Sequence, residues 1–354
     1  MNDVHDEIRQ LLKDLISSVK RKPQNIHHSL KRFSDAFVYG RIYEHPLHLN
    51  ELMSKGLKVM TQLTAISNVP LGNITDHFPF LIHAPRWLPG LRHLLTASQT
   101  RSDLLSCLDL HYQAAMTEKQ ERGAEKLAQR IIRSEARVED KNEFDKWLLG
   151  IAAISSPDST GSMLRTAVTA LALHPQPQRK AFNEVQSVMG KTAFVRWSDL
   201  GNLPYISALI KEIYRWFPIA PLPAPRVAST DIPSESGYII PQGSVIVPLP
   251  FIMMQDESLY AEPASFRPER FLRDNPEMDP TPYSFGFGKR TCPAIHTIQI
   301  FVSVAIANII ANIELSTAAQ WQRIEDDNIE DDEVAFVRYL KQIPLEIKVG
   351  ELAL

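Results

Sequence analysis

The stretch that decides the fold reads Phe285-Gly286-Phe287-Gly288-Lys289-Arg290-Thr291-Cys292-Pro293-Ala294. A phosphate-binding loop needs Gly-Lys followed by Ser or Thr, and here Arg290 follows Lys289, so that motif does not fit. A zinc site could begin with Cys292 and His296, but no second ligand pair stands at a usable spacing, and the other cysteine is Cys107. Both interpretations are therefore weak.

A third interpretation is a glycine-rich loop that lays its backbone against a flat cofactor and presents one thiolate at the start of a helix. Glycines permit close approach of the backbone. A nearby helix N-terminus and the charge of Arg290 favour the thiolate over the thiol. One cysteine suffices as an axial ligand of haem iron, and Cys292 has the right position for that role.

This stretch resembles the haem-binding loop of the cytochrome P450 superfamily, whose pattern is Phe-Gly-x-Gly-x-Arg-x-Cys-x-Gly. The chain departs from the pattern only at Ala294; it matches at Phe285, Gly286, Gly288, Arg290 and Cys292. The resemblance implies haem b as cofactor and Cys292 as the thiolate ligand of its iron. It also implies that Phe285 packs under the haem and that Arg290 faces a propionate.

A second match is Glu212-Ile213-Tyr214-Arg215, which resembles the Glu-x-x-Arg of the family's K helix. Taken alone, it could be an exposed i,i+3 ion pair that contributes only about 0.2–0.5 kcal/mol. However, the segment 266–271 resembles the family's meander motif and supplies Arg270. The resemblance implies that Glu212, Arg215 and Arg270 form a structural charge triad beneath the haem. It also implies that Arg226, in a strand-like Ala-Pro-Arg segment, meets a propionate.

A third match lies at Ser155-Ser156-Pro157-Asp158-Ser159-Thr160, inside a helical pattern that runs from about 142 to 173. The family carries (Ala/Gly)-Gly-x-(Asp/Glu)-Thr there, so the resemblance implies catalytic roles for Asp158, Ser159 and Thr160. The acid and the hydroxyl would pass protons towards bound dioxygen, and Pro157 would break the helix. The alternative is an ordinary kinked helix whose hydroxyls bond back to the preceding turn.

Composition narrows the possible partners. The chain has 354 residues, with 38 basic and 41 acidic side chains, so its formal charge is 38 − 41 = −3, which predicts no nucleic-acid partner. The longest apolar run, 245–254, contains two prolines, so we expect no membrane span. The acidic segment 324–333 is predicted to be a solvated loop.

The predicted fold class is mainly α with small β sheets, a cytochrome P450 fold that lacks its N-terminal anchor, helices A to C and most of the first sheet. We expect one truncated haem-thiolate domain over 1–354. Its parts are a mainly helical 1–217 with a distal helix at about 142–173 and a K helix at about 204–217, a β and coil meander with the haem loop at 218–293, a helix at 294–313, and a C-terminal loop and β segment at 314–354. Short strands are expected at 237–240 and 244–247, in a window (201–293) that holds 15 prolines.

By resemblance, the function is that of a haem-thiolate monooxygenase. It would oxidise a small apolar molecule in fungal secondary metabolism, with dioxygen and electrons from an NADPH-cytochrome reductase. The alternatives are a catalytically inactive homologue, either a gene remnant or an incorrectly assembled gene product, and a reductase-independent haem-thiolate isomerase or dehydratase. The expected localisation is the cytoplasm, or the surface of the endoplasmic reticulum if an anchor precedes the sequence.

Overall fold

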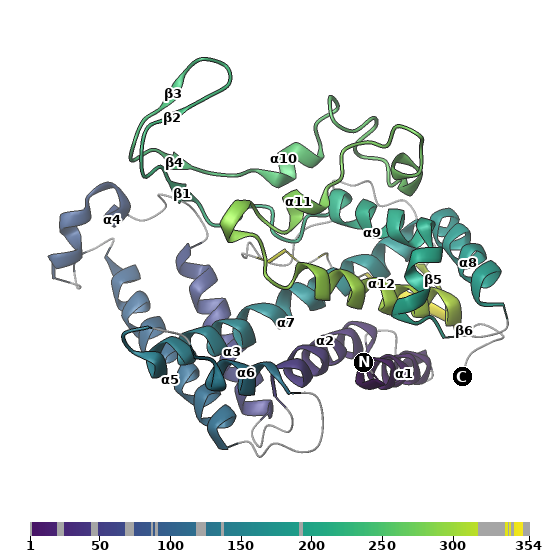
Figure 1. Ribbon diagram of the computed structural model, residues 1–354, viewed down its shortest axis with the longest axis horizontal. Coiled ribbons are helices and arrows are strands. Elements are labelled where there is room, and N and C mark those ends of the chain that lie inside the picture. The colour runs from purple at the N-terminus through teal and green to yellow at the C-terminus, as the bar shows by residue number, and fades with distance from the viewer. Residues whose placement is uncertain are drawn as a thin grey trace. The chain divides into compact units, whose positions relative to one another are not determined.

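The computed structural model describes residues 2–19, 25–43, 49–67, 74–85, 88, 91–117, 125–135, 138–190, 194–317, 337–338, 340 and 343–349. This part is mainly helical with small antiparallel sheets, as the fold class predicts (Figure 1). It divides into two compact units. Unit 1 comprises Met1–Leu15 and Asn25–Leu164, and unit 2 comprises Ile16–Gln24 and Arg165–Leu354. The acidic segment 324–333 lies outside the described residues.

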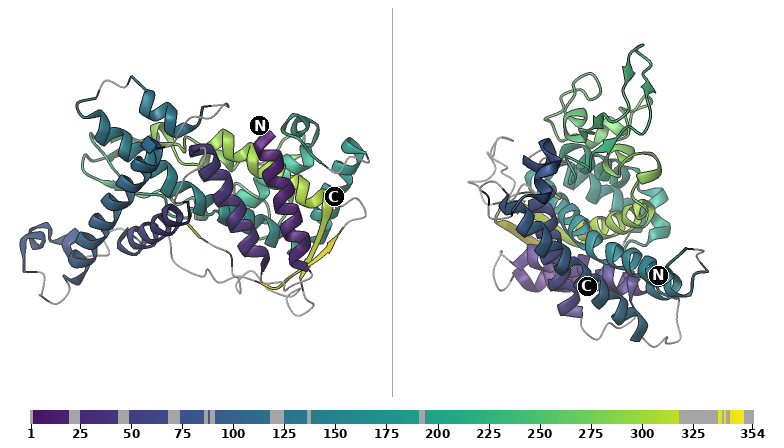
Figure 2. Two further views of the ribbon diagram at one scale, coloured as in Figure 1. Left: turned by 90° about the horizontal axis from the view of Figure 1, so that it is seen from below. Right: turned by 90° about the vertical axis from the view of Figure 1, so that its left-hand side faces the viewer.

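Unit 1 is entirely helical in its described residues. Its elements are most of α1 (Asn2–Val19), then α2 (Asn25–Ile42), α3 (Leu49–Ser67), α4 (Ile74–His77), η1 (Pro79–His83), α5 (Arg92–Thr117), α6 (Leu127–Arg133) and most of α7 (Lys141–Leu173). Helices α1 and α2 lie side by side, and a Cβ on Gly40 would come 3.2 Å from the Glu7 carboxylate (Figure 2).

The core of unit 1 joins α3, α5 and α7. Val59, Cys107, Leu108 and Ile154 are buried together there. Gly150 on α7 lets α5 approach closely, because a Cβ at this position would lie 2.1 Å from the Leu108 side chain. Asp158 therefore lies on a helix, α7, that is tightly packed against α5 two turns before it.

Unit 2 combines helices with short strands. Its helical elements are α8 (Pro175–Met189), η2 (Trp197–Asn202), α9 (Pro204–Trp216), α10 (Pro250–Met254), η3 (Pro268–Phe271), α11 (Thr281–Ser284), η4 (Gly288–Arg290) and α12 (Ile295–Asn312). Its strands pair as β1 (Arg226–Val227) with β4 (Val245–Ile246), β2 (Ile232–Pro233) with β3 (Ile239–Ile240), and β5 (Ile313–Thr317) with β6 (Leu345–Val349).

Several prolines of unit 2 begin helical segments. Pro175, Pro204, Pro250 and Pro268 each occupy the first position of a helix, where the missing N–H costs no intrahelical bond. The proline-rich window is therefore more than coil and short strands, because its prolines also define where α9, α10 and η3 start.

Helix α12 is the apolar centre of unit 2. Its Asn308 is fully buried, donates to Val195 O at 2.8 Å and accepts from Val195 N at 2.9 Å. The helix is long and apolar enough, by length and composition, to cross a membrane, although 61% of it is buried in the protein. The expected absence of a membrane span is thus not confirmed. Polar residues interrupt the helix, so it forms no continuous apolar run.

Candidate functional site

Cys292 lies between η4 and α12, at the end of the glycine loop. Its backbone N–H donates to Phe285 O at 2.7 Å, and its own carbonyl accepts from Ile295 N at 3.3 Å. Gly286 has a φ of +86° and Gly288 a φ of +57°, left-handed conformations that favour glycine. The sequence requires these glycines because the chain must fold back on itself within a few residues of the cysteine.

The two cysteines differ sharply in environment. Cys107 is fully buried in unit 1, and burial raises the pKa of its thiol to about 11. Cys292 is only half-buried, and neither cysteine forms a disulfide. Lys289 and Arg290 beside it are exposed cationic residues. Cys292 is therefore the thiol that is placed to act as a ligand.

Phe285 connects this loop to helix α9. Its ring meets the Tyr214 ring edge-on, with centroids 5.3 Å apart and an interplanar angle of 82°. Phe285 is half-buried, and its carbonyl holds the Cys292 N–H. The position of the cysteine thus depends on an aromatic contact with the helix that carries Glu212 and Arg215.

The predicted triad is assembled and fully buried. Arg215 donates to the two carboxylate oxygens of Glu212, through Nε at 2.9 Å and Nη2 at 2.8 Å. Arg270 from η3 places its Nε 3.1 Å from Glu212 Oε2. All three residues have no exposed surface. The exposed ion pair considered from the sequence is wrong, because η3 covers this face of α9.

Further partners of the triad carried no sequence motif. Arg270 also pairs with Glu277, so two carboxylates balance the two guanidinium groups. Arg215 donates to Met254 O and Ser265 O, and Arg270 donates to Ala261 O, Glu262 O and Ser265 O. Because backbone carbonyls leave no trace in a sequence, only the charged members could be found there. The triad organises the coil that precedes the cysteine loop.

Asp158, Ser159 and Thr160 lie on α7 in unit 1. Asp158 is 3.5 Å from Lys31 Nζ on α2, and the same ammonium lies 2.6 Å from Asp35. Ser159 donates weakly to Ser155 O at 3.4 Å and Ser156 O at 3.2 Å. Thr160 is buried and donates to Ser156 O at 2.9 Å. The hydroxyls therefore bond back to the preceding turn.

Helix α7 does not break at Pro157, contrary to the sequence expectation. The helix continues from Lys141 to Leu173 with Pro157 inside it. Proline removes one backbone donor, but Ser155 and Ser156 donate their hydroxyls to helix carbonyls, and Ser34 on α2 donates to Pro157 O at 2.8 Å. These three hydroxyls bond to the α7 carbonyls of Ile151, Ala152 and Pro157, close to the proline.

Arg226 belongs to β1 and is exposed. Its guanidinium donates to the carbonyls of Ala224 at 2.8 Å and Pro225 at 3.1 Å. The Arg226 guanidinium is thus held at the start of β1 by hydrogen bonds to the two preceding residues.

Cys292 is thus a half-buried thiol on a glycine loop, and the buried charge triad holds the coil that precedes this loop. A family model described as cytochrome P450 matches residues 1–333. The chain belongs to the cytochrome P450 family, whose members carry a haem-thiolate centre.

Named relatives are fungal enzymes. A cytochrome P450 monooxygenase of Postia placenta is 29% identical over 88% of this chain and 62% of its own length. One of Aspergillus oryzae is 27% identical over 86% and 60%. O-methylsterigmatocystin oxidoreductase of Aspergillus flavus is 28% identical over 77% and 53%. The chain thus spans about three-fifths of the length of the first two relatives.

The residues around Cys292 fit a haem. Haem iron needs one protein donor on this side, and Cys292 supplies one accessible thiol. The position of Gly286 favours glycine because of its φ of +86° and not because of crowding, since a Cβ there would make an ordinary contact at 3.5 Å from Arg290 O. The described residues contain no group of three or more His, Cys, Asp or Glu that could hold a metal ion.

Proposed function

We propose that this chain is a haem-thiolate monooxygenase in which Cys292 is the ligand of the iron. The observation that carries the proposal is the half-buried Cys292 thiol at the start of α12, on a loop with two left-handed glycines. Haem, when bound, supplies the chemistry of dioxygen activation. The N–H of Cys292 donates to Phe285 O, which fixes the loop backbone so that the thiolate is presented in one orientation.

The cationic side chains have a supporting role in this proposal. Arg290 and Arg226 are both exposed guanidinium groups of unit 2, and each can form a bidentate pair with a carboxylate such as a haem propionate. Glu212, Arg215 and Arg270 keep the preceding coil in place and make no contact with substrate. We assign them a structural role.

Proton delivery is assigned to Asp158, with Ser159 and Thr160 beside it. The Asp158 carboxylate lies 3.5 Å from the Lys31 ammonium, and this contact orients it on α7. The hydroxyl of Ser159 makes only long bonds at 3.2 and 3.4 Å, so it can turn to donate elsewhere, whereas the buried Thr160 bonds its helix at 2.9 Å. Of the two hydroxyls, we therefore assign proton transfer to that of Ser159, acting together with the Asp158 carboxylate.

The substrate class and partners follow the relatives. We propose a small apolar substrate from fungal secondary metabolism, because one relative is an O-methylsterigmatocystin oxidoreductase. Electrons would come from an NADPH-cytochrome reductase. The same proposal places the protein where that reductase works, at the endoplasmic reticulum surface or in the adjoining cytoplasm.

The test is a spectrum of the protein reconstituted with haem, reduced and exposed to carbon monoxide. We expect a thiolate-type Soret band in the wild type and its loss in Cys292→Ala. Cys107→Ala is the matched control and should keep the band, because this thiol is buried in unit 1. A band that survives Cys292→Ala would refute the proposed ligand.

Turnover separates the remaining alternatives. Product that forms only with reductase and NADPH supports the monooxygenase. Product that forms without NADPH identifies the isomerase or dehydratase alternative. Haem binding without any turnover of fungal metabolites identifies the inactive homologue.

A further inference from the structure

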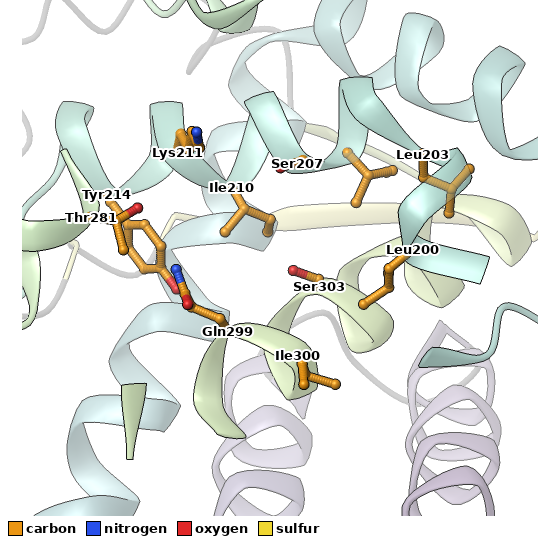
Figure 3. A pocket seen from close by; sticks show the side chains of 11 residues that line it. Leu200, Leu203, Ser207, Ile210, Lys211, Tyr214, Thr281, Gln299, Ile300 and Ser303 are labelled. Atoms are coloured by element: carbon orange, nitrogen blue, oxygen red, sulfur yellow. The ribbon is translucent and has the colours of Figure 1, made fainter. Parts of the chain in front are cut away.

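A cavity of about 240 Å³ lies within unit 2, bounded by η2, α9 and α12 and partly open to solvent (Figure 3). Its apolar lining comes from leucine and isoleucine side chains of these elements and of the residue between η2 and α9, namely Leu200, Leu203, Ile206, Ile210 and Ile300. Its polar lining comes from Ser207, Tyr214, Gln299 and Ser303, together with Thr281. The cysteine loop does not line it, so the cavity is separate from the candidate site described above.

Tyr214 gives the cavity lining a buried hydroxyl group that lacks a hydrogen-bond partner among the described residues. Its side chain is only 4% exposed, and its hydroxyl has no hydrogen-bond partner among the residues that the structure describes. Figure 3 shows the ring reaching from α9 towards Gln299 on α12, beside the cavity. A buried hydroxyl without a partner is rare and costly, and a bound molecule with an oxygen acceptor would satisfy it.

Charge and size restrict what can bind. The one ionisable amine in the lining, Lys211, is paired with Asp279 at 2.7 Å, so the cavity offers no uncompensated charge. At about 30 Å³ per water molecule, its volume equals about eight waters, which is room for one ring with a short substituent. Burial raises the pKa of Tyr214 above its usual range, so its hydroxyl remains a donor.

We infer that this cavity is a binding site for a small neutral molecule with one ring and a single oxygen function, such as an alkylphenol or aryl alcohol. The ring lies against the apolar walls, and the oxygen accepts a hydrogen bond from Tyr214. No covalent step is involved. Because binding needs no haem, this inference can hold whether or not the proposed function does.

Occupancy of this site is coupled to the cysteine loop. Tyr214 contacts Phe285 edge-on at 5.3 Å between ring centroids, and Phe285 O holds the N–H of Cys292 at 2.7 Å. A ligand that fixes the Tyr214 hydroxyl restrains its ring, and through Phe285 it restrains the loop.

The binding test uses the full chain with labelled isoleucine methyl groups and three probes of one shape. We expect 4-ethylphenol to shift the methyl signals of Ile206, Ile210 and Ile300, which line the cavity. Ethylbenzene, without the hydroxyl, should bind about three- to tenfold more weakly. The anion 4-ethylbenzoate should not bind. If 4-ethylphenol leaves these signals unchanged, or if the three probes bind equally, the inference is wrong.

Substitutions in the cavity lining test whether the probe binds there. Tyr214→Phe should weaken 4-ethylphenol about three- to tenfold and leave ethylbenzene unchanged, because it removes only the hydroxyl. Ser303→Leu should block both probes by filling the space. Ser187→Leu, on the exposed face of α8, is the matched control and should bind like wild type. Equal binding of 4-ethylphenol by Tyr214→Phe and wild type would refute the assigned contact, even if Ser303→Leu fails to fold.

Amide hydrogen exchange measures the coupling between occupancy of the cavity and the cysteine loop. Saturating 4-ethylphenol should slow amide exchange in peptides that span 285–292, with no change in peptides that span 313–317 of strand β5. Unchanged exchange at 285–292 in a protein that binds the probe would refute the coupling.

Discussion

The buried Glu212 carboxylate is the shared partner of two guanidinium groups in unit 2. Its two oxygens meet two guanidinium groups and the backbone N–H of Arg267 at 2.7 Å, with no solvent contact. Removing its charge leaves Arg215 and Arg270 buried, and among the described residues only Arg270 keeps a carboxylate partner, Glu277. We expect Glu212→Gln to lower the free energy of unfolding by about 3–5 kcal/mol, measured by denaturant unfolding followed by tryptophan fluorescence.

The matched control for this residue is Glu314→Gln. Glu314 pairs with Lys348 at 3.7 Å, and these two side chains are 60% and 83% exposed. Surface pairs contribute about 0–1 kcal/mol, so the same substitution there should cost little. Equal losses in the two variants would show that burial of Glu212 does not determine its contribution.

The triad also shows which individual residues of a buried network can be predicted from the sequence. Glu212, Arg215 and Arg270 were found because charged residues stood in a family-like order. Glu277 and the four backbone carbonyls that accept from the two arginines were not, since nothing in their local sequence distinguishes them. Likewise, the pairing of Asp158 with Lys31 depends on the packing of α2 against α7, which one sequence does not reveal.

At the scale of elements, prolines and periodicity predicted where helices lie, but not what holds their ends. Helix α9 was expected at about 204–217 and runs from Pro204 to Trp216, and α12 was expected at 294–313 and runs from Ile295 to Asn312. The residue before α9, Leu203, offers no capping side chain. Glu184 on α8 supplies the cap instead, accepting from Tyr205 N at 2.7 Å and Ile206 N at 2.9 Å.

This distant cap gives a prediction for the element. Glu184→Ala should destabilise unit 2 by about 1–2 kcal/mol, because two helix donors and a favourable charge at the N-terminus of α9 lose their partner. The measurement is the unfolding midpoint in urea. Glu257→Ala, at an exposed position, should change stability by less than about 0.5 kcal/mol. A loss no larger than that of the control would mean that water replaces the cap.

At the scale of the whole molecule, the ordered motifs predicted one family fold, and one family model indeed spans residues 1–333. The division into two compact units at 164/165, inside α7, was not predicted. Motif order reports ancestry along the chain, whereas compact units depend on the density of contacts. Helix α7 runs without interruption from Lys141 to Leu173, so the sequence gives no sign of a boundary between Leu164 and Arg165.

Among the described residues, His111 in unit 1 and His174 in unit 2 have pKa values that desolvation lowers, so each makes stability depend on pH. In unit 1, burial lowers the pKa of His111 to about 4, and its Nδ1 lies 2.7 Å from Tyr43 Oη. In unit 2, burial lowers the pKa of His174 to about 4, and its ring stacks on Phe266 at 4.5 Å. The unfolded chain has its histidines near pKa 6.5, so between pH 6.5 and 4 it binds more protons than the folded protein.

Stability should therefore fall as pH drops through that window, by on the order of 3 kcal/mol for the fully buried His111. Unfolding in urea at a series of pH values from 7 to 4 measures this slope. In His111→Gln, where the side-chain oxygen can still accept from Tyr43, the slope should flatten although the stability at pH 7 is also reduced. His28→Gln, at an exposed position of α2, should retain the wild-type slope. An unchanged slope in His111→Gln would show that other groups, not this histidine, take up the protons.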